Sequence, residues 1–144
     1  ERARELGATD VINALDCDVV EEIMLRTHNR GVDYSIEAIG RPKTIEQSYK
    51  VVRAGGGMAI VAGNVNHQET ISINPFDLIY GKRLLGTWGG ETQPDNDFPR
   101  YVDLCLSGRW NLEKLISHRY NLQEINEAFL ALSQGQLLRA IVTF

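Results

Sequence analysis

Apolar residues along the chain recur with two alternating periods, one typical of helices and the other of strands. Spacings of three and four predict a helix that follows Asp16 or Asp18, and a second helix at 42–52. A continuous apolar run at 58–62 is typical of a strand buried on both faces of a parallel sheet. The glycines at 55–57 lie between that helix and that strand, which is the wrong polarity for a phosphate-binding loop. We therefore interpret them as a helix terminator.

The same reasoning predicts the remaining elements. Helices are predicted at 1–6, 19–27, 42–52, 75–80, 98–106 and 122–132, and strands at 10–13, 32–39, 58–62, 70–73, 83–88 and 138–144. The polar stretch 91–97 contains Pro94 and predicts a surface loop. Strands that alternate with helices over short connections indicate an α/β fold, in which helices cover a parallel sheet.

Composition limits the possible functions. With 144 residues, of which 43% are hydrophobic and 24% charged, the chain has the makeup of one globular domain. The net charge is -4 and no basic cluster is longer than Lys82-Arg83, which argues against nucleic acid as a partner. No apolar run approaches the roughly 20 residues of a membrane span and no signal peptide is visible, so we expect a cytoplasmic protein.

Cysteines and histidines give no sign of a metal site. Cys17 and Cys105 are too few and too far apart for a disulfide framework or a Cys-x-x-Cys site, which fits a reducing compartment. His28, His67 and His118 share no metal-ligand spacing, so we expect structural or surface histidines. The sequence therefore predicts no metal ligand in this chain.

Five blocks of sequence, in this order and spacing, carry a family resemblance. They are ARELGATDVIN (3–13), GVDYSIEAIGRPKTI (31–45), INPFDLIYGKRLLGTWGG (73–90), ISHRYNLQEINEAF (116–129) and LLRAIVTF (137–144). Together they closely resemble the C-terminal part of medium-chain, zinc-dependent alcohol dehydrogenases. The match covers essentially the whole chain and is specific for the family, whereas no block is a signature of one substrate.

The resemblance implies a partial Rossmann-type domain across 1–144, a doubly wound parallel sheet with helices on both faces that binds NAD or NADP. Its last part, at about 107–144, would be a return segment that packs on the catalytic domain. The strands at 32–39, 58–62 and 83–88 would be the fourth, fifth and sixth of the sheet. The G-x-G-x-x-G loop of the first half does not occur in this sequence, so we expect a truncated chain.

Nine residues are assigned to the cofactor site by this resemblance. They are Ala38, Ile39 and Arg41 beside the adenosine, Ala62, Gly63 and Asn64 beside the nicotinamide ribose, Thr87 and Trp88 near the carboxamide, and Arg139 at the pyrophosphate. A guanidinium suits a phosphate because it donates two parallel hydrogen bonds. The structural alternatives remain open: Arg41 as a solvated residue at a helix start, Ala62–Asn64 as an ordinary turn, and Trp88 as a packed aromatic.

Catalysis in this family uses groups that the sequence lacks. Zinc acts there as a Lewis acid on the alcohol oxygen, and hydride passes to the nicotinamide. The zinc ligands lie in an N-terminal catalytic domain, so no catalytic residue is assigned here and we expect the isolated chain to be inactive. Whether the chain is an enzyme on its own stays open. The alternative function is a free-standing, non-catalytic module that self-associates or binds a partner, from a truncated gene. A zinc-free quinone or enoyl reductase of the same superfamily is a third option.

Association is the last expectation. The apolar strand at 83–88 resembles the family's outer strand, which pairs with its copy across a two-fold axis, and Gly86 permits close approach of another backbone. We therefore expect a homodimer through Arg83–Trp88, unless the loop at 91–97 covers that edge. The strand at 32–39 would also present an apolar edge, because the strands that normally pair with it are missing.

Overall fold

A computed structural model of the protein describes residues 2–144. The chain divides into two compact units, and the boundary falls between Glu91 and Thr92. In the first unit the elements are α1 Arg2–Glu5, α2 Val19–Arg26, β1 Tyr34–Glu37, α3 Pro42–Val51, β2 Met58–Val61, α4 Pro75–Ile79, β3 Arg83–Gly86 and the short 3-10 helix η1 Gly89–Glu91.

The first unit is built on a three-stranded parallel sheet in the order β1-β2-β3. Tyr34 of β1 pairs with Met58 of β2, which pairs with Arg83 of β3. The predicted class, a partial parallel sheet with helices, is confirmed. Because the three strands run in the same direction, their carboxyl ends share one edge of the sheet.

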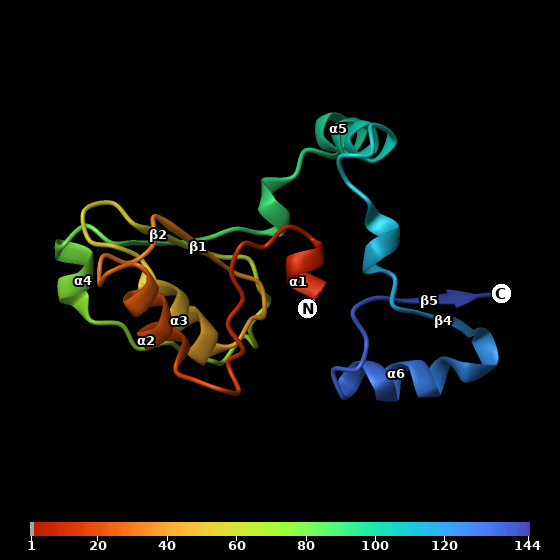
Figure 1. The fold of residues 1–144 in the computed structure, drawn as a ribbon, viewed down its shortest axis with the longest axis horizontal. Helices are drawn as coiled ribbons and strands as arrows, with labels where there is room; N and C mark the ends of the chain where they lie inside the picture. The colour runs from red at the N-terminus through yellow and green to blue at the C-terminus, as the bar shows by residue number, and fades with distance from the viewer. Residues whose placement is uncertain (1) are drawn as a thin grey trace. The chain divides into compact units, whose positions relative to one another are not determined.

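Helix α3 packs against β1 and β2 and supplies most of the core (Figure 1). It begins at Pro42, whose missing N–H is not needed in a first turn, and Arg41 before it is extended. The sequence predicts one inner face with Ile45, Ser48, Tyr49 and Val52. Ile45, Tyr49 and Val52 are buried and Ser48 is half-buried, which confirms that face. Tyr49 forms the centre of the core together with Val52 and Ala59.

Helix α2 packs on α3. Of the two candidate caps, Asp18 is the one used, because its carboxylate accepts hydrogen bonds from the amides of Val20 at 2.8 Å and Glu21 at 3.0 Å. The spacing of Val19, Val20, Ile23, Met24 and Thr27 predicts an apolar stripe that lies in the core. In the structure this stripe is only half-buried. Val19 and Ile23 of this stripe border an open groove beside β1.

The second unit contains a parallel strand pair joined through a helix. Its elements are α5 Pro94–Leu106, the 3-10 helices η2 Leu112–Leu115 and η3 Leu122–Glu124, β4 His118–Asn121, α6 Ile125–Ser133 and β5 Ala140–Thr143. The two strands pair in parallel, with His118 opposite Ala140 and Asn121 opposite Thr143. Helix α6 lies between them in sequence, as a parallel connection requires.

Four local predictions were wrong. The segments 10–13 and 70–73 are not strands, because a strand exists only within a ladder and neither segment pairs with another. The predicted loop at 91–97 is helical from Pro94 onward, since proline and the acidic Asp95 and Asp97 suit a first turn. Strand β4 was missed because its residues, His-Arg-Tyr-Asn, show no apolar alternation.

Across residues 2–144, every helix is too short or too polar to span a membrane.

Candidate functional site

The carboxyl ends of β1, β2 and β3 bring most of the predicted site residues together. Glu37 pairs with Val61, and Val61 pairs with Gly86, so the segments that follow them leave the sheet side by side. The amide of Ala62 donates to the Glu37 carbonyl at 2.8 Å, and the amide of Thr87 donates to the Val61 carbonyl at 2.9 Å. Eight of the nine predicted residues belong to these segments, and they are Ala38, Ile39, Arg41, Ala62, Gly63, Asn64, Thr87 and Trp88. The end of a parallel sheet is where open α/β folds bind ligands.

The strand ends present an exposed and partly apolar surface. Ile39 is 65% exposed and Trp88 is 85% exposed, so neither side chain belongs to the core of this unit. Ala38, Ala62 and Asn64 are also exposed. Large exposed apolar side chains at the end of a sheet can contact a flat ring of a ligand. The exposure of Trp88 speaks against the packed-aromatic interpretation within this unit.

Arg41 ends the segment after β1 and precedes α3. Its carbonyl accepts hydrogen bonds from the Ile45 amide at 3.0 Å and the Thr44 hydroxyl at 2.9 Å. Its exposed guanidinium makes no hydrogen bond or ion pair within residues 2–144. The main chain of Arg41 is therefore fixed, whereas its charge is free to meet a ligand or water.

Sequence reasoning missed one residue of the site, Glu37. The last residue of β1 is only 4% exposed although it is charged. Its Oε1 accepts hydrogen bonds from the amides of Ile39 and Gly40 and from the Thr44 hydroxyl, each at 2.8 Å. Its Oε2 is buried and has no partner among the described residues. An acidic residue that ends a strand and is followed by Ala-Ile-Gly is the only signal that the sequence carried.

Two glycines let the segments after β1 and β2 touch. A Cβ built on Gly40 would lie 2.5 Å from the carbonyl carbon of Asn64, and Gly40 has a positive φ of 79°. A Cβ built on Gly63 would lie 2.7 Å from the Gly40 Cα and 2.8 Å from the Glu37 Oε2. Neither space admits a side chain, so the two segments pack backbone against backbone.

Arg139 belongs to the second unit, where it immediately precedes β5. Its main chain is held by Ser117, whose amide donates to the Arg139 carbonyl at 2.9 Å and whose Oγ accepts from the Arg139 amide at 3.3 Å. The side chain is exposed, and its guanidinium forms no ion pair in the described part of the chain. Its predicted role at a pyrophosphate stays a prediction.

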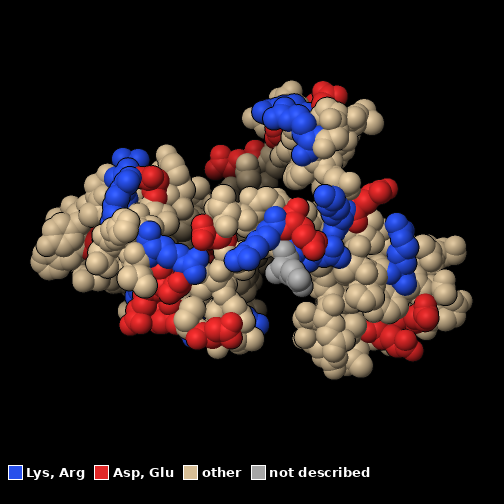
Figure 2. Space-filling view, viewed as in Figure 1, with Lys and Arg blue, Asp and Glu red and all other residues tan. Residues whose placement is uncertain are grey.

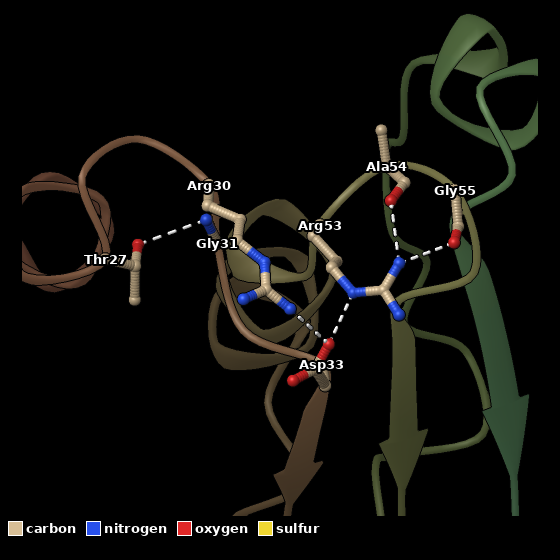
Figure 3. Close-up of polar contacts among 7 residues, drawn as sticks. All are labelled: Thr27, Arg30, Gly31, Asp33, Arg53, Ala54 and Gly55. Carbon is tan, nitrogen blue, oxygen red and sulfur yellow. Dashed lines mark hydrogen bonds and ion pairs between the residues drawn. The ribbon is translucent and has the colours of Figure 1, made fainter.

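The opposite end of the sheet carries a charged network of a different kind (Figure 3). Asp33, just before β1, accepts hydrogen bonds from Arg53 and from Arg30, the latter at 3.0 Å. The Arg53 guanidinium also donates to the carbonyls of Ala54 and Gly55. The hydrogen bond from Arg53, aided by the charges of both arginines, lowers the pKa of Asp33. This network joins the amino ends of β1 and β2. Its charged side chains bind one another and main-chain carbonyls.

No metal centre forms among residues 2–144, because no three His, Cys, Asp or Glu side chains gather as ligands. Cys17 is exposed and Cys105 is half-buried, and both are free thiols. The arrangement at the strand ends of the first unit is thus one for binding, through exposed apolar side chains and the unpaired guanidinium of Arg41.

Comparison with known proteins gives consistent matches. Residues 1–107 match the family model described as zinc-binding dehydrogenase. The curated protein Alcohol dehydrogenase-like 5 from Arabidopsis thaliana is 35% identical over 144 residues, which are 99% of this chain and 37% of that protein. The crystal structure of benzyl alcohol dehydrogenase from Acinetobacter calcoaceticus superimposes with a TM-score of 0.88 at 30% identity and covers 97% of this chain and 38% of that chain. A zinc-binding dehydrogenase from Sinorhizobium meliloti 1021, bound to NADP, has a TM-score of 0.76 at 32% identity over 88% of this chain and 36% of that one.

A parallel α/β sheet with an open edge of strand ends defines a Rossmann-type ligand-binding fold. The chain belongs to the zinc-binding dehydrogenase family. The resemblance to the C-terminal cofactor part of medium-chain alcohol dehydrogenases is confirmed. The chain spans a little over a third, 37%, of the length of the curated relative described above.

Proposed function

We propose that this chain is the cofactor-binding portion of an alcohol dehydrogenase that transfers hydride between an alcohol and NAD or NADP. The observation that carries the proposal is the shared edge formed by the carboxyl ends of β1, β2 and β3, with the side chains of Ile39 and Trp88 exposed beside it. The family match supports it, as does the NADP bound to a relative from Sinorhizobium meliloti.

Each segment at the strand ends has a task in this proposal. The segment after β1, with Ala38, Ile39 and Arg41, contacts the adenosine and its ribose. The segment after β2, 62–64, lies beside the nicotinamide ribose, and the backbone at 87–88 meets the carboxamide. Exposed apolar side chains exclude water from the rings, while main-chain groups held by the sheet orient them.

The arginine at position 139 pairs with the pyrophosphate in this proposal. Its side chain is exposed and makes no ion pair among the described residues, so a phosphate would not displace an existing partner. Its backbone is fixed by Ser117, so the main chain at Arg139 would not have to be ordered on binding.

The chemistry of the reaction lies outside these groups. A bound nicotinamide accepts or donates the hydride. Zinc does not fit the described part of this chain, since no set of ligands gathers among residues 2–144. We propose that the chain by itself does not turn over an alcohol and that the whole enzyme supplies any metal site from other residues.

Two partners follow from this proposal, a nicotinamide cofactor and a second copy of the chain. Strand β3 is an edge strand of the sheet, and its Leu85 is 49% exposed. In a symmetric pair of β3 strands, the backbone groups of that edge would bond to their copies.

On the face that Figure 2 shows, basic side chains are interspersed with acidic ones rather than merged into a stripe, which supports a small-molecule partner over nucleic acid.

One observation favours the alternative function, a non-catalytic module that associates through strand pairing. On β1, whose outer edge is unpaired among residues 2–144, Tyr34 is 69% exposed and Ile36 is 72% exposed. The apolar groove bordered by Val19 and Ile23 lies beside this strand. Such an edge pairs with any available strand. Intact mass measurement on the natural protein separates the two functions, because a natural product of 144 residues would favour the module.

The proposed function is tested by calorimetric titration of the intact protein with NADH and NADPH. We expect binding of one cofactor at one site per chain. The variant Arg139→Ala should bind it more weakly by about 1–3 kcal/mol, the contribution of a hydrogen bond to a charged group. Arg119→Ala is the matched control, since Arg119 is another exposed arginine of the same strand pair. Equal affinity of both variants would remove Arg139 from the site, and no binding by the unmodified protein would overturn the proposal.

A further inference from the structure

Glu37 is a buried charged residue to which the proposed function gives no task. It ends β1, between the two segments that are proposed to contact the cofactor. Only 4% of its surface is exposed, and burial of a carboxylate is unfavourable unless the group is well hydrogen-bonded. A residue of this kind at the edge of a binding site invites a specific explanation.

The side chain of Glu37 holds the segment after β1. Its Oε1 takes three donors at 2.8 Å, the amides of Ile39 and Gly40 and the hydroxyl of Thr44. These bonds connect the end of β1 to the first turn of α3 and fix the backbone on both sides of Arg41.

The main chain of Glu37 holds the segment after β2. Its carbonyl accepts from the amides of Ala62 at 2.8 Å and Gly63 at 3.0 Å. Gly63 in turn packs on Gly40 and on the Glu37 carboxylate so closely that a Cβ on Gly63 would lie 2.8 Å from Oε2. One residue thus contacts both segments, through different atoms.

We propose that Glu37 is a positioning residue that keeps the segments 38–41 and 62–64 together as one rigid platform for the cofactor. This inference rests on the proposed function for its consequence, but not for its structural content. The carboxylate fixes Gly40, Gly40 supports Gly63, and the second segment therefore depends on a side chain to which it donates no hydrogen bond. If the two segments are fixed before binding, the protein loses less conformational entropy when the cofactor binds.

The variants that test this are Glu37→Leu, which cannot accept hydrogen bonds, and Glu37→Gln, which keeps one acceptor oxygen for the three donors. Asp33→Asn is the matched control, because Asp33 is an acid at the other end of the same strand, where it pairs with Arg30 and Arg53 (Figure 3). Thr44→Val removes one of the three donors and serves as a milder variant if Glu37→Leu does not fold.

Amide hydrogen exchange of the intact protein without cofactor is the first measurement. In Glu37→Leu we expect exchange at least about 10-fold faster at Ile39 and Gly40 and also at Ala62 and Gly63, although the acceptor of the latter two remains. Glu37→Gln should stay near the unmodified protein, Thr44→Val should be intermediate, and Asp33→Asn should leave all four amides unchanged. Faster exchange confined to Ile39 and Gly40, or spread evenly over the unit, would overturn the platform.

The second measurement is a calorimetric titration of the same variants with NADH or NADPH, whichever of the two the unmodified protein binds. Loss of hydrogen bonds to a charged group predicts an affinity about 10-fold lower for Glu37→Leu. Glu37→Gln and Asp33→Asn should bind within about 3-fold of the unmodified protein. Unchanged affinity of Glu37→Leu despite loosened segments would refute the positioning role. Failure of the unmodified protein to bind either cofactor would count against the proposed function alone, since the exchange result still decides whether the platform exists.

Discussion

Glycine is required at position 63 because another backbone fills the space that a side chain would need. A Cβ there would come within 2.7 Å of the Gly40 Cα, and backbone cannot move aside as a flexible side chain can. We expect Gly63→Ala to lower the free energy of unfolding by about 1–3 kcal/mol, as overpacking does, and to weaken cofactor binding. Chemical denaturation and calorimetric titration measure the two effects.

The control for this substitution is Gly86→Ala, at the end of β3. A Cβ on Gly86 meets no atom of residues 2–144 within 4 Å, so the unit should keep its stability within about 0.5 kcal/mol. Equal stability of the two variants would show that the contact between Gly40 and Gly63 is not tight in solution.

Asp33 gives a prediction about pH. Its pKa is lower in the folded chain because Arg53 and Arg30 stabilise the carboxylate, so folding is favoured where the carboxylate is ionised. This contribution is complete above the unfolded pKa of about 4 and is lost as the pH falls through the lower folded value. Asp33→Asn should therefore be less stable than the unmodified protein at pH 7 and equally stable in strong acid. The effect is small because the side chains are exposed.

Denaturation curves between pH 2 and pH 7 follow this difference, with pH values chosen around the ordinary pKa of aspartate, about 3.9. Asp103→Asn is the control, since the Asp103 carboxylate makes no ion pair among residues 2–144. A stability gap that persists unchanged into strong acid would mean that Asp33 acts through something other than its charge.

Helix α3 packs on the sheet through Tyr49, whose hydroxyl group makes no hydrogen bond among the described residues. Tyr49 is 1% exposed. Burial raises the pKa of this hydroxyl, and the nearby charge of Asp77 raises it further. The ring itself packs in the core, with the Lys82 ammonium 5.8 Å from its centroid.

We expect Tyr49→Phe to be at least as stable as the unmodified protein, because the ring remains and an unsatisfied buried polar group is removed. A raised folded pKa favours folding below the unfolded value, near 10, and this contribution is lost as the pH rises further. The advantage of Tyr49→Phe should thus widen above about pH 10. Tyr80→Phe is the control, since Tyr80 is 64% exposed. Destabilisation of Tyr49→Phe at neutral pH would reveal a partner for the hydroxyl, such as a buried water.

The state of association depends on β3, the edge strand whose other side is open in the first unit. If two copies pair through β3, a charge on the seam would be buried without a partner and would separate them. We expect the unmodified protein to sediment as a dimer at tens of micromolar, and Leu85→Lys to sediment as a folded monomer. Lys43→Leu, at an exposed position of α3, is the control. Lys82→Leu is unsuitable, because the Lys82 ammonium forms an ion pair with Asp77 and donates to the Lys50 carbonyl. A monodisperse monomer of the unmodified protein would contradict the proposed pairing.

The sequence by itself determined the elements whose pattern is local. The cap at Asp18, the start of α3 at Pro42 and the buried face of α3 follow from capping and helical spacing. The apolar run at 58–62 predicts a strand buried on both faces, and β2 does form at Met58–Val61, but only Ala59 is buried and the other three residues are half-buried. The segments that line the strand ends could be located in the same way, because a turn must follow each strand. The family resemblance added their proposed roles.

Tertiary structure decided what depends on residues distant in sequence. The segments 10–13 and 70–73 have the composition of strands but no strand to pair with, whereas β4 lacks the pattern and forms because β5 lies beside it. Glu37 became a site residue only when the fold placed Gly40, Thr44 and Gly63 around its carboxylate. The physical reason is that hydrogen bonding between strands and the burial of a charge depend on neighbours that the chain brings together only by folding.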